Sequence, residues 1–247
     1  MPRTARKISS TGYMHIIARG IGRQILFESS SDYRKYLLLL QKYCNETNVK
    51  ICAFCLMENH VHLLTHSEKD ALVLMMKALN TTYAGYFNNK YERTGHLFQN
   101  RYKSEPIEDE RYLLTVFRYI LLNPQKAGIC NASDYTWSSY SLYEKNTDFM
   151  ELDLIRELIG DPMQYKCYIE SDNDDECLEW DYSKRDDAWA INEIKSLLHV
   201  NNFTDIQRYD SVSRNRALSI LRKRGLSIRQ IERLTGISRG IIKDINK

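Results

Sequence analysis

The chain has 247 residues, of which 43% are hydrophobic and 27% are charged, and its formal net charge is +3. This composition is typical of a soluble globular protein, and no apolar run approaches the roughly 20 residues that a membrane helix needs. The basic N-terminus lacks a following apolar region, so we expect no secretion signal, no membrane partner and a cytoplasmic protein with reduced cysteines.

Charge is distributed unevenly along the chain. Residues 211–247 contain ten basic and two acidic side chains, whereas residues 170–187 contain nine acidic and two basic ones. The near-neutral total charge is therefore the sum of a basic C-terminal module and an acidic connector that precedes it.

The hydrophobic periodicity predicts a sequence of short elements. In chain order these are a strand at 13–18, a helix after the capping candidates Ser29–Ser31, strands at 49–57 and 61–65, a helix at 71–87, an extended run at 97–107, and a helix from about 108 that ends at Pro124. This order predicts an α+β fold: a ferredoxin-like antiparallel sheet with helices on one face. We expect a catalytic domain at 1–148, an acidic linker at 149–187, and a small all-α domain at 188–247.

Two histidines mark a candidate metal site at the start of the third predicted strand. His60 and His62 are two residues apart, so a strand places both imidazoles on one face. Val61 then points to the opposite face, into the expected core. The alternative is a pair of buried, hydrogen-bonded histidines without a metal ion.

The last helix of the predicted domain carries a candidate nucleophile. Tyr119 and Asn123 are four residues apart and therefore share one helix face. Tyr112 lies on nearly the same face and is the rival nucleophile, and Pro124 disfavours helical geometry at Asn123. A hydroxyl beside two imidazoles and an amide would make a metal-assisted nucleophilic site.

A zinc site is a weaker alternative. Cys52 and Cys55 precede the two histidines and would complete four ligands. A regular strand, however, sends these two cysteines to opposite faces.

Basic, aromatic and amide side chains follow one another between residues 91 and 103. Cations neutralise phosphates and rings stack on unpaired bases, so this run is a candidate DNA-binding segment; the alternative is a solvated strand edge. The candidate contacts are Arg93, His96, Gln99, Arg101, Tyr102 and Lys103.

Three motifs in this order resemble those of the single-tyrosine HUH transposases of the insertion-sequence type, and most of all the branch associated with REP sequences. They are Glu58-Asn59-His60-Val61-His62, Gly95-His96-Leu97-Phe98-Gln99-Asn100-Arg101-Tyr102, and Tyr119-Ile120-Leu121-Leu122-Asn123-Pro124. The resemblance covers about residues 8 to 145.

The resemblance implies a role for each matching residue. His60 and His62 would bind Mg²⁺ or Mn²⁺ with Asn123 as a further ligand, and Tyr119 would attack single-stranded DNA beside a hairpin to leave a 5′-phosphotyrosine. A DNA-binding regulator that no longer cuts DNA is the alternative function. Monomer and homodimer both remain open.

The C-terminal module has the pattern of a helix-turn-helix. Ser227 and Gln230 form a capping box, Thr235 and Gly236 mark a turn, and Ser238 precedes a second helix. We expect it to contact DNA, including duplex DNA; the alternative is a helical hairpin that docks on the first domain. The candidate contacts are Arg222, Arg224, Ser238, Arg239 and Lys243.

Overall fold

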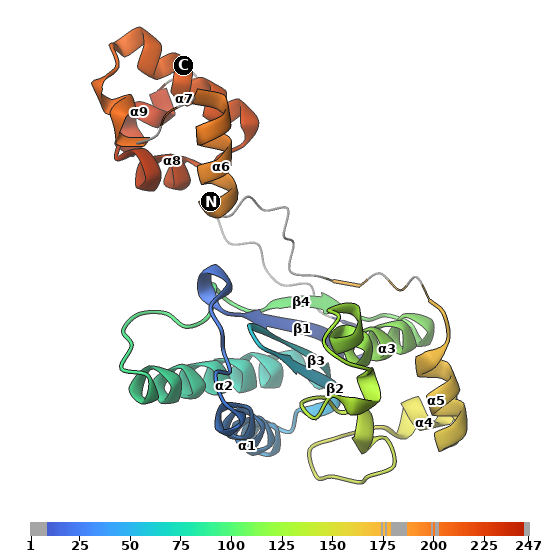
Figure 1. Ribbon diagram of the computed structural model, residues 1–247. Helices are drawn as coiled ribbons and strands as arrows, with labels where there is room; N and C mark the ends of the chain where they lie inside the picture. The colour runs from blue at the N-terminus through green and yellow to red at the C-terminus, as the bar shows by residue number, and fades with distance from the viewer. Residues whose placement is uncertain are drawn as a thin grey trace. The chain divides into compact units, whose positions relative to one another are not determined.

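The computed structural model describes residues 9–173, 175, 177–178, 187–198, 200 and 203–244. The chain divides into two compact units, Met1–Trp180 and Asp181–Lys247 (Figure 1). Of the helices within the described residues, none has the length and apolar character that crossing a lipid bilayer requires.

The first unit is built on one antiparallel sheet. Its strands are β1 (Tyr13–Arg19), β2 (Lys50–Met57), β3 (His60–His66) and β4 (Lys103–Pro106), in the order β2-β3-β1-β4. This is the ferredoxin-like order, so the predicted fold class is confirmed. The extended run at 97–107 pairs only in part, because Asn100 adopts a left-handed φ of 62° and interrupts it before β4.

Helices cover both faces of this sheet rather than one. Helices α1 (Ser30–Thr47) and α2 (Lys69–Lys90) pack on one face, and α3 (Glu110–Lys126) packs on the other (Figure 1). The expectation of helices on a single face is corrected here because β2 is buried on both of its faces from Ile51 to Met57. A strand of this kind needs a cover on each side.

Helix α3 continues through its proline. Pro124 lies in the last turn, and the helix ends at Lys126 rather than at Pro124 as predicted. A proline so close to the end removes one backbone hydrogen bond without stopping the chain from completing the turn. Asn123 therefore remains helical, one turn after Tyr119.

The first unit extends beyond the predicted boundary at residue 148. Helices α4 (Asp153–Ile159) and α5 (Pro162–Glu170) bury Ile155, Tyr165 and Ile169 in the same core as α3. The beginning of the expected linker at 149–187 is thus part of this unit, because its apolar residues cover the α3 layer. Much of its acidic stretch lies outside the described residues. The short 3-10 helices of this unit are η1 (Ile21–Arg23), η2 (Ala132–Asp134) and η3 (Tyr140–Leu142).

The described part of the second unit is entirely helical. It contains α6 (Asp187–Leu198), η4 (Phe203–Arg208), α7 (Ser211–Arg224), α8 (Ile228–Thr235) and α9 (Arg239–Asp244) around a separate core. Ser227 and Gln230 form the expected capping box, and Gly236 turns the chain with a φ of 72°. Ile237 is buried in the core, so the turn between α8 and α9 is anchored.

Candidate active site

His60 and His62 of β3 lie on the face that α3 covers. His62 is opposite Ile17 of β1 and Cys55 of β2, whereas Val61 points into the core under α1 and α2. The ring centroids of His60 and His62 are 5.0 Å apart. The strand pleat thus turns both imidazoles toward one region, as the sequence predicts.

Each of these imidazoles has one ring nitrogen engaged. Nδ1 of His60 lies 2.7 Å from Oδ1 of Asn59, and Nδ1 of His62 lies 3.1 Å from Nε2 of His15. Because an amide oxygen only accepts, His60 donates to Asn59 through Nδ1–H, which leaves the lone pair of a neutral imidazole on its Nε2.

Burial keeps the histidines uncharged. It lowers the pKa of His60 to about 4, with a further contribution from Arg19 on the neighbouring strand, and lowers the pKa of His62 well below its usual value. The neutral imidazole is the form that ligates metal ions. Near neutral pH both side chains are therefore in the protonation state that a metal site needs.

His15 is a site residue that sequence reasoning missed. It lies on β1, is fully buried, and its ring stacks against that of His62 with centroids 5.3 Å apart. Burial lowers its pKa to about 3. The alternation of β1 gives its face, but only the pairing of β1 with β3 brings it to His62.

Tyr119 reaches the histidines from α3. Its side chain is 4% exposed, and its ring centroid lies 5.8 Å from that of His62 and 6.0 Å from that of His15. Nζ of Lys126 lies 4.7 Å from the centroid of the Tyr119 ring. The positive charge of Lys126 would stabilise negative charge that develops on the phenol.

Asn123 is positioned by the same helix. Its Nδ2 donates to the backbone oxygen of Tyr119 over 2.9 Å. This bond uses the amide nitrogen, so the amide oxygen retains its lone pairs for a cation.

The rival Tyr112 has a different environment. Its hydroxyl donates to Oε2 of Glu105 over 2.7 Å, and burial together with this hydrogen bond raises the pKa of Tyr112. A phenol with a raised pKa is a poorer nucleophile. The hydroxyl of Tyr112 is thus engaged by Glu105, whereas the ring of Tyr119 contacts the ring of His62.

The cysteines of the zinc alternative lie in the α3 core. A register shift between Ile51 and Ala53 brings both Cys52 and Cys55 into this core, contrary to the expectation of opposite faces. Burial raises the pKa of Cys52 well above its usual value. Among the described residues, neither thiol belongs to a group of three or more His, Cys, Asp or Glu side chains that could hold a metal ion.

The donor set near Tyr119 fits an open divalent-cation site. Within the part of the chain that the structure describes, no group of three or more His, Cys, Asp or Glu side chains has metal-binding geometry. At such a site His60 and His62 would supply two neutral nitrogens and Asn123 an amide oxygen, and the other positions would fall to oxygens of water or substrate.

The predicted DNA-binding segment divides into two groups. His96, Arg101 and Lys103 line a groove of about 830 Å³ together with Ile21, Phe98 and Asn100. Tyr102 also borders this groove, but it is only 9% exposed and its ring belongs to the α1–α2 core.

Arg93 and Gln99 are held beside this segment. The guanidinium of Arg93 donates to Oε1 of Gln24 over 2.9 Å. The backbone nitrogen of Gln99 donates to the oxygen of Arg19 over 2.7 Å. Neither residue lines the groove, so their roles as DNA contacts remain predictions.

The candidate DNA contacts of the second unit also differ in whether their side chains are engaged within the unit. Arg222 donates to the backbone oxygen of Leu226, Arg224 pairs with Glu193, and Arg239 pairs with Glu232. Ser238 and Lys243 are exposed at the start and near the end of α9.

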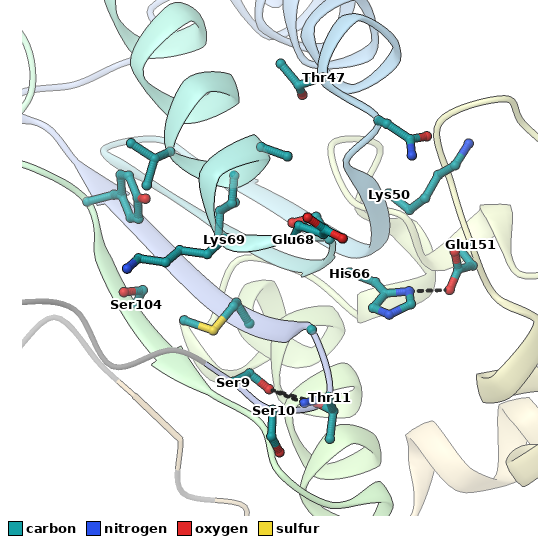
Figure 2. Close-up of a pocket in the computed structure, with 18 residues that line it drawn as sticks. Ser9, Ser10, Thr11, Thr47, Lys50, His66, Glu68, Lys69, Ser104 and Glu151 are labelled. Carbon is teal, nitrogen blue, oxygen red and sulfur yellow. Dashed lines mark hydrogen bonds and ion pairs between the residues drawn. The ribbon is translucent and has the colours of Figure 1, made fainter.

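A second hollow of about 890 Å³ lies at the opposite end of β3. Figure 2 shows His66 joined to Glu151 there, with Lys69 and Ser104 farther along the wall. Nδ1 of His66 lies 2.6 Å from Oε1 of Glu151, so this third histidine of β3 is engaged by a carboxylate. We therefore place the candidate active site at His60, His62 and Tyr119.

A ferredoxin-like sheet with two histidines facing a helix tyrosine is the arrangement that the predicted resemblance to the single-tyrosine transposases implies. Residues 8–123 match the family model described as IS200-like transposase. The predicted resemblance is thus confirmed over this part of the chain.

Two solved structures are similar to the chain. One is described as a REP-associated tyrosine transposase bound to a REP hairpin (14% identity, 72% of this chain and 99% of that chain, TM-score 0.48). The other is a putative transposase from Deinococcus radiodurans R1 (18% identity, 48% of this chain and 95% of that chain, TM-score 0.33). No curated protein matches the chain.

Proposed function

We propose that the first unit cleaves single-stranded DNA and transfers the cut strand through a covalent bond to Tyr119. The observation that carries this proposal is the position of the Tyr119 ring, 5.8 Å from that of His62, in a domain that matches the family model of the IS200-like transposases. A phenol is a weak nucleophile in isolation and needs an environment that stabilises its negative charge.

The proposed reaction is a phosphoryl transfer. The Tyr119 oxygen attacks the scissile phosphorus, the bond from phosphorus to the 3′ oxygen breaks, and the proton lost by the phenol is balanced by the proton gained at the 3′-OH. The product is a 5′-phosphotyrosine and a free 3′-OH. Attack by another 3′-OH reverses the step and joins two strands without ATP, because the phosphodiester energy is kept in the tyrosyl bond.

His60, His62 and Asn123 are the proposed ligands of a divalent cation, Mg²⁺ or Mn²⁺. When bound, such an ion polarises a phosphate oxygen and offsets the negative charge that develops during transfer. Lys126 adds a positive charge 4.7 Å from the centroid of the phenol ring.

We further propose that the DNA is single-stranded beside a hairpin and enters the groove of His96, Arg101 and Lys103. The groove combines cations with the ring of Phe98, a combination suited to phosphates and unpaired bases. The REP-associated relative was solved with a hairpin bound. The second unit would then hold the adjacent duplex through α9, with Ser238 and Lys243 nearest to it.

A denaturing gel tests the proposal. The full chain is incubated with hairpin-containing single-stranded oligonucleotides, with and without Mn²⁺ or Mg²⁺, and then treated with SDS. We expect a metal-dependent covalent protein–DNA band that Tyr119→Phe abolishes. Tight hairpin binding without an adduct would instead favour a regulator that no longer cuts DNA.

A further inference from the structure

His15 has two neighbours that determine which of its nitrogens carries the proton. Its Nε2 lies 3.1 Å from Nδ1 of His62, and its Nδ1 lies 4.0 Å from Oε2 of Glu105. Within the described residues, Nδ1 of His15 is buried and makes no hydrogen bond. The carboxylate of Glu105 is therefore the charged group that this nitrogen faces.

The orientation of Glu105 is maintained by two donors. Oε2 accepts a hydrogen bond from the Tyr112 hydroxyl over 2.7 Å and another from the backbone nitrogen of Leu178 over 3.2 Å. The same oxygen faces His15. Tyr112 thus has a structural use that does not require it to act as a nucleophile.

The charge of Glu105 then determines which nitrogen of each imidazole carries the proton. A neutral imidazole has one N–H and one lone pair, and a carboxylate attracts the N–H and repels the lone pair. The proton of His15 therefore belongs on Nδ1, toward Glu105, which leaves Nε2 as an acceptor. The hydrogen bond between the two histidines then requires His62 to donate through Nδ1–H, and the lone pair of His62 lies on Nε2.

We propose that His15, oriented by Glu105, is a positioning residue that fixes His62 in the tautomer whose Nε2 can ligate a divalent cation. The inference rests on the proposed metal-dependent function. His60 reaches the same tautomer through Asn59, so the two imidazoles are prepared by different neighbours. Partners of this kind around a ligating histidine typically change metal affinity by about 10- to 100-fold when they are removed.

The first experiment reads the tautomers directly, in the wild-type chain and without metal. Long-range proton–nitrogen correlation spectra of isotope-labelled histidine distinguish Nδ1–H from Nε2–H, and single-histidine variants assign the signals. We expect His15, His60 and His62 all as Nδ1–H forms. An Nε2–H form of His62 would overturn the proposal.

The second experiment measures Mn²⁺ affinity of the full chain in the absence of DNA. We expect His15→Leu to weaken binding by about tenfold or more, because no acceptor remains for His62. His15→Gln, which can present an amide oxygen, should recover most of it. His66→Gln is the matched control, since His66 lies at the far end of β3 and pairs with Glu151.

The outcomes separate this inference from the proposed function. If the wild type forms the covalent adduct while His15→Leu binds Mn²⁺ as tightly as the wild type, the positioning role is wrong and the function stands. If Mn²⁺ binding depends on His15 but no DNA yields an adduct, the function fails and the positioning role stands. A wild-type chain that binds no Mn²⁺ overturns both.

Discussion

The ring of Tyr119 lies edge-on to the ring of His62, with an interplanar angle of 71° and centroids 5.8 Å apart. Tyr119 comes from α3 and His62 from β3, so their contact depends on the packing of α3 against the face of the sheet that is opposite to α1 and α2. This contact brings the candidate nucleophile to the candidate metal ligands.

Replacement of Tyr119 by Phe should abolish the covalent DNA adduct, because the hydroxyl that attacks phosphorus is lost. Hairpin binding should change by less than about threefold, since the buried ring remains in place. Adduct formation is read on SDS gels and binding by fluorescence anisotropy. Tyr112→Phe is the matched comparison, and loss of the adduct in that variant alone would make Tyr112 the nucleophile.

Replacement of His60 by Ala should remove Mn²⁺-dependent cleavage while the fold is retained. His60 is only partly buried at the edge of the site, so its truncation leaves the core of the unit intact. Calorimetric titration with Mn²⁺ and circular dichroism provide the two readings. Cleavage at the wild-type rate would exclude His60 from the metal site.

Acid should destabilise the first unit through its buried histidines. The folded pKa values of His15 and His60 are about 3 and about 4, below the unfolded value near 6.5. At pH values between the folded and unfolded pKa, the unfolded chain binds more protons than the folded chain. The contribution of these histidines to the free energy of unfolding is therefore fully present above about pH 6.5, and it decreases as the pH falls toward the folded pKa values.

The slope should reach about 1.4 kcal/mol per pH unit for each such histidine. Urea unfolding of the full chain between about pH 6.5 and pH 5 measures this slope. Asp32, whose pKa is lowered to about 2, stays ionised over this pH range. His15→Leu should lose the contribution of one proton to this slope. An unchanged slope would contradict the assignment of a neutral, buried His15.

Removal of Arg101 should weaken binding to single-stranded DNA and reduce its salt dependence. Arg101 is exposed and lines the groove with Lys103. For a side chain that neutralises one phosphate, Arg101→Ala should lower the slope of log affinity against log salt by about 0.7. Lys42→Ala, which removes an exposed cation of α1, should leave the slope unchanged.

Removal of Lys243 should weaken duplex binding with little effect on single-stranded cleavage. Lys243 is exposed on α9, whereas Arg239 on the same helix is paired with Glu232. We expect Lys243→Ala to act uniformly across duplex sequences, because a lysine on a phosphate reads no base. Titration of labelled duplexes measures it, and equal affinity for wild type and variant would remove α9 from the DNA interface.

Local sequence rules were most informative where neighbouring residues define a face. The alternation of β3 placed His60 and His62 together, and the helical period placed Asn123 one turn after Tyr119. The capping box of Ser227 and Gln230 was equally visible, because its two hydrogen bonds span three residues.

Other features depended on contacts between distant segments. A bulge in β2 moved Cys52 into the α3 core, and apolar residues of α4 and α5 extended the first unit past residue 148. Tyr102, predicted as a DNA contact, borders the groove and also has its ring packed in the α1–α2 core. Local spacing does not show which distant segment will cover a given surface.

The sequence by itself determined the resemblance to the IS200-like transposases, the ferredoxin-like order of elements and the pair of histidines, because these follow from motifs and short-range periodicity. Only the tertiary structure decided that α3 covers the second face of the sheet, that Tyr119 rather than Tyr112 meets the histidines, and that His15 contacts His62. The physical reason is that these contacts join segments far apart in the sequence. The register of β1 against β3, for example, brings together His15 and His62, which are 47 positions apart. Such a register depends on the packing of the whole sheet rather than on a local pattern.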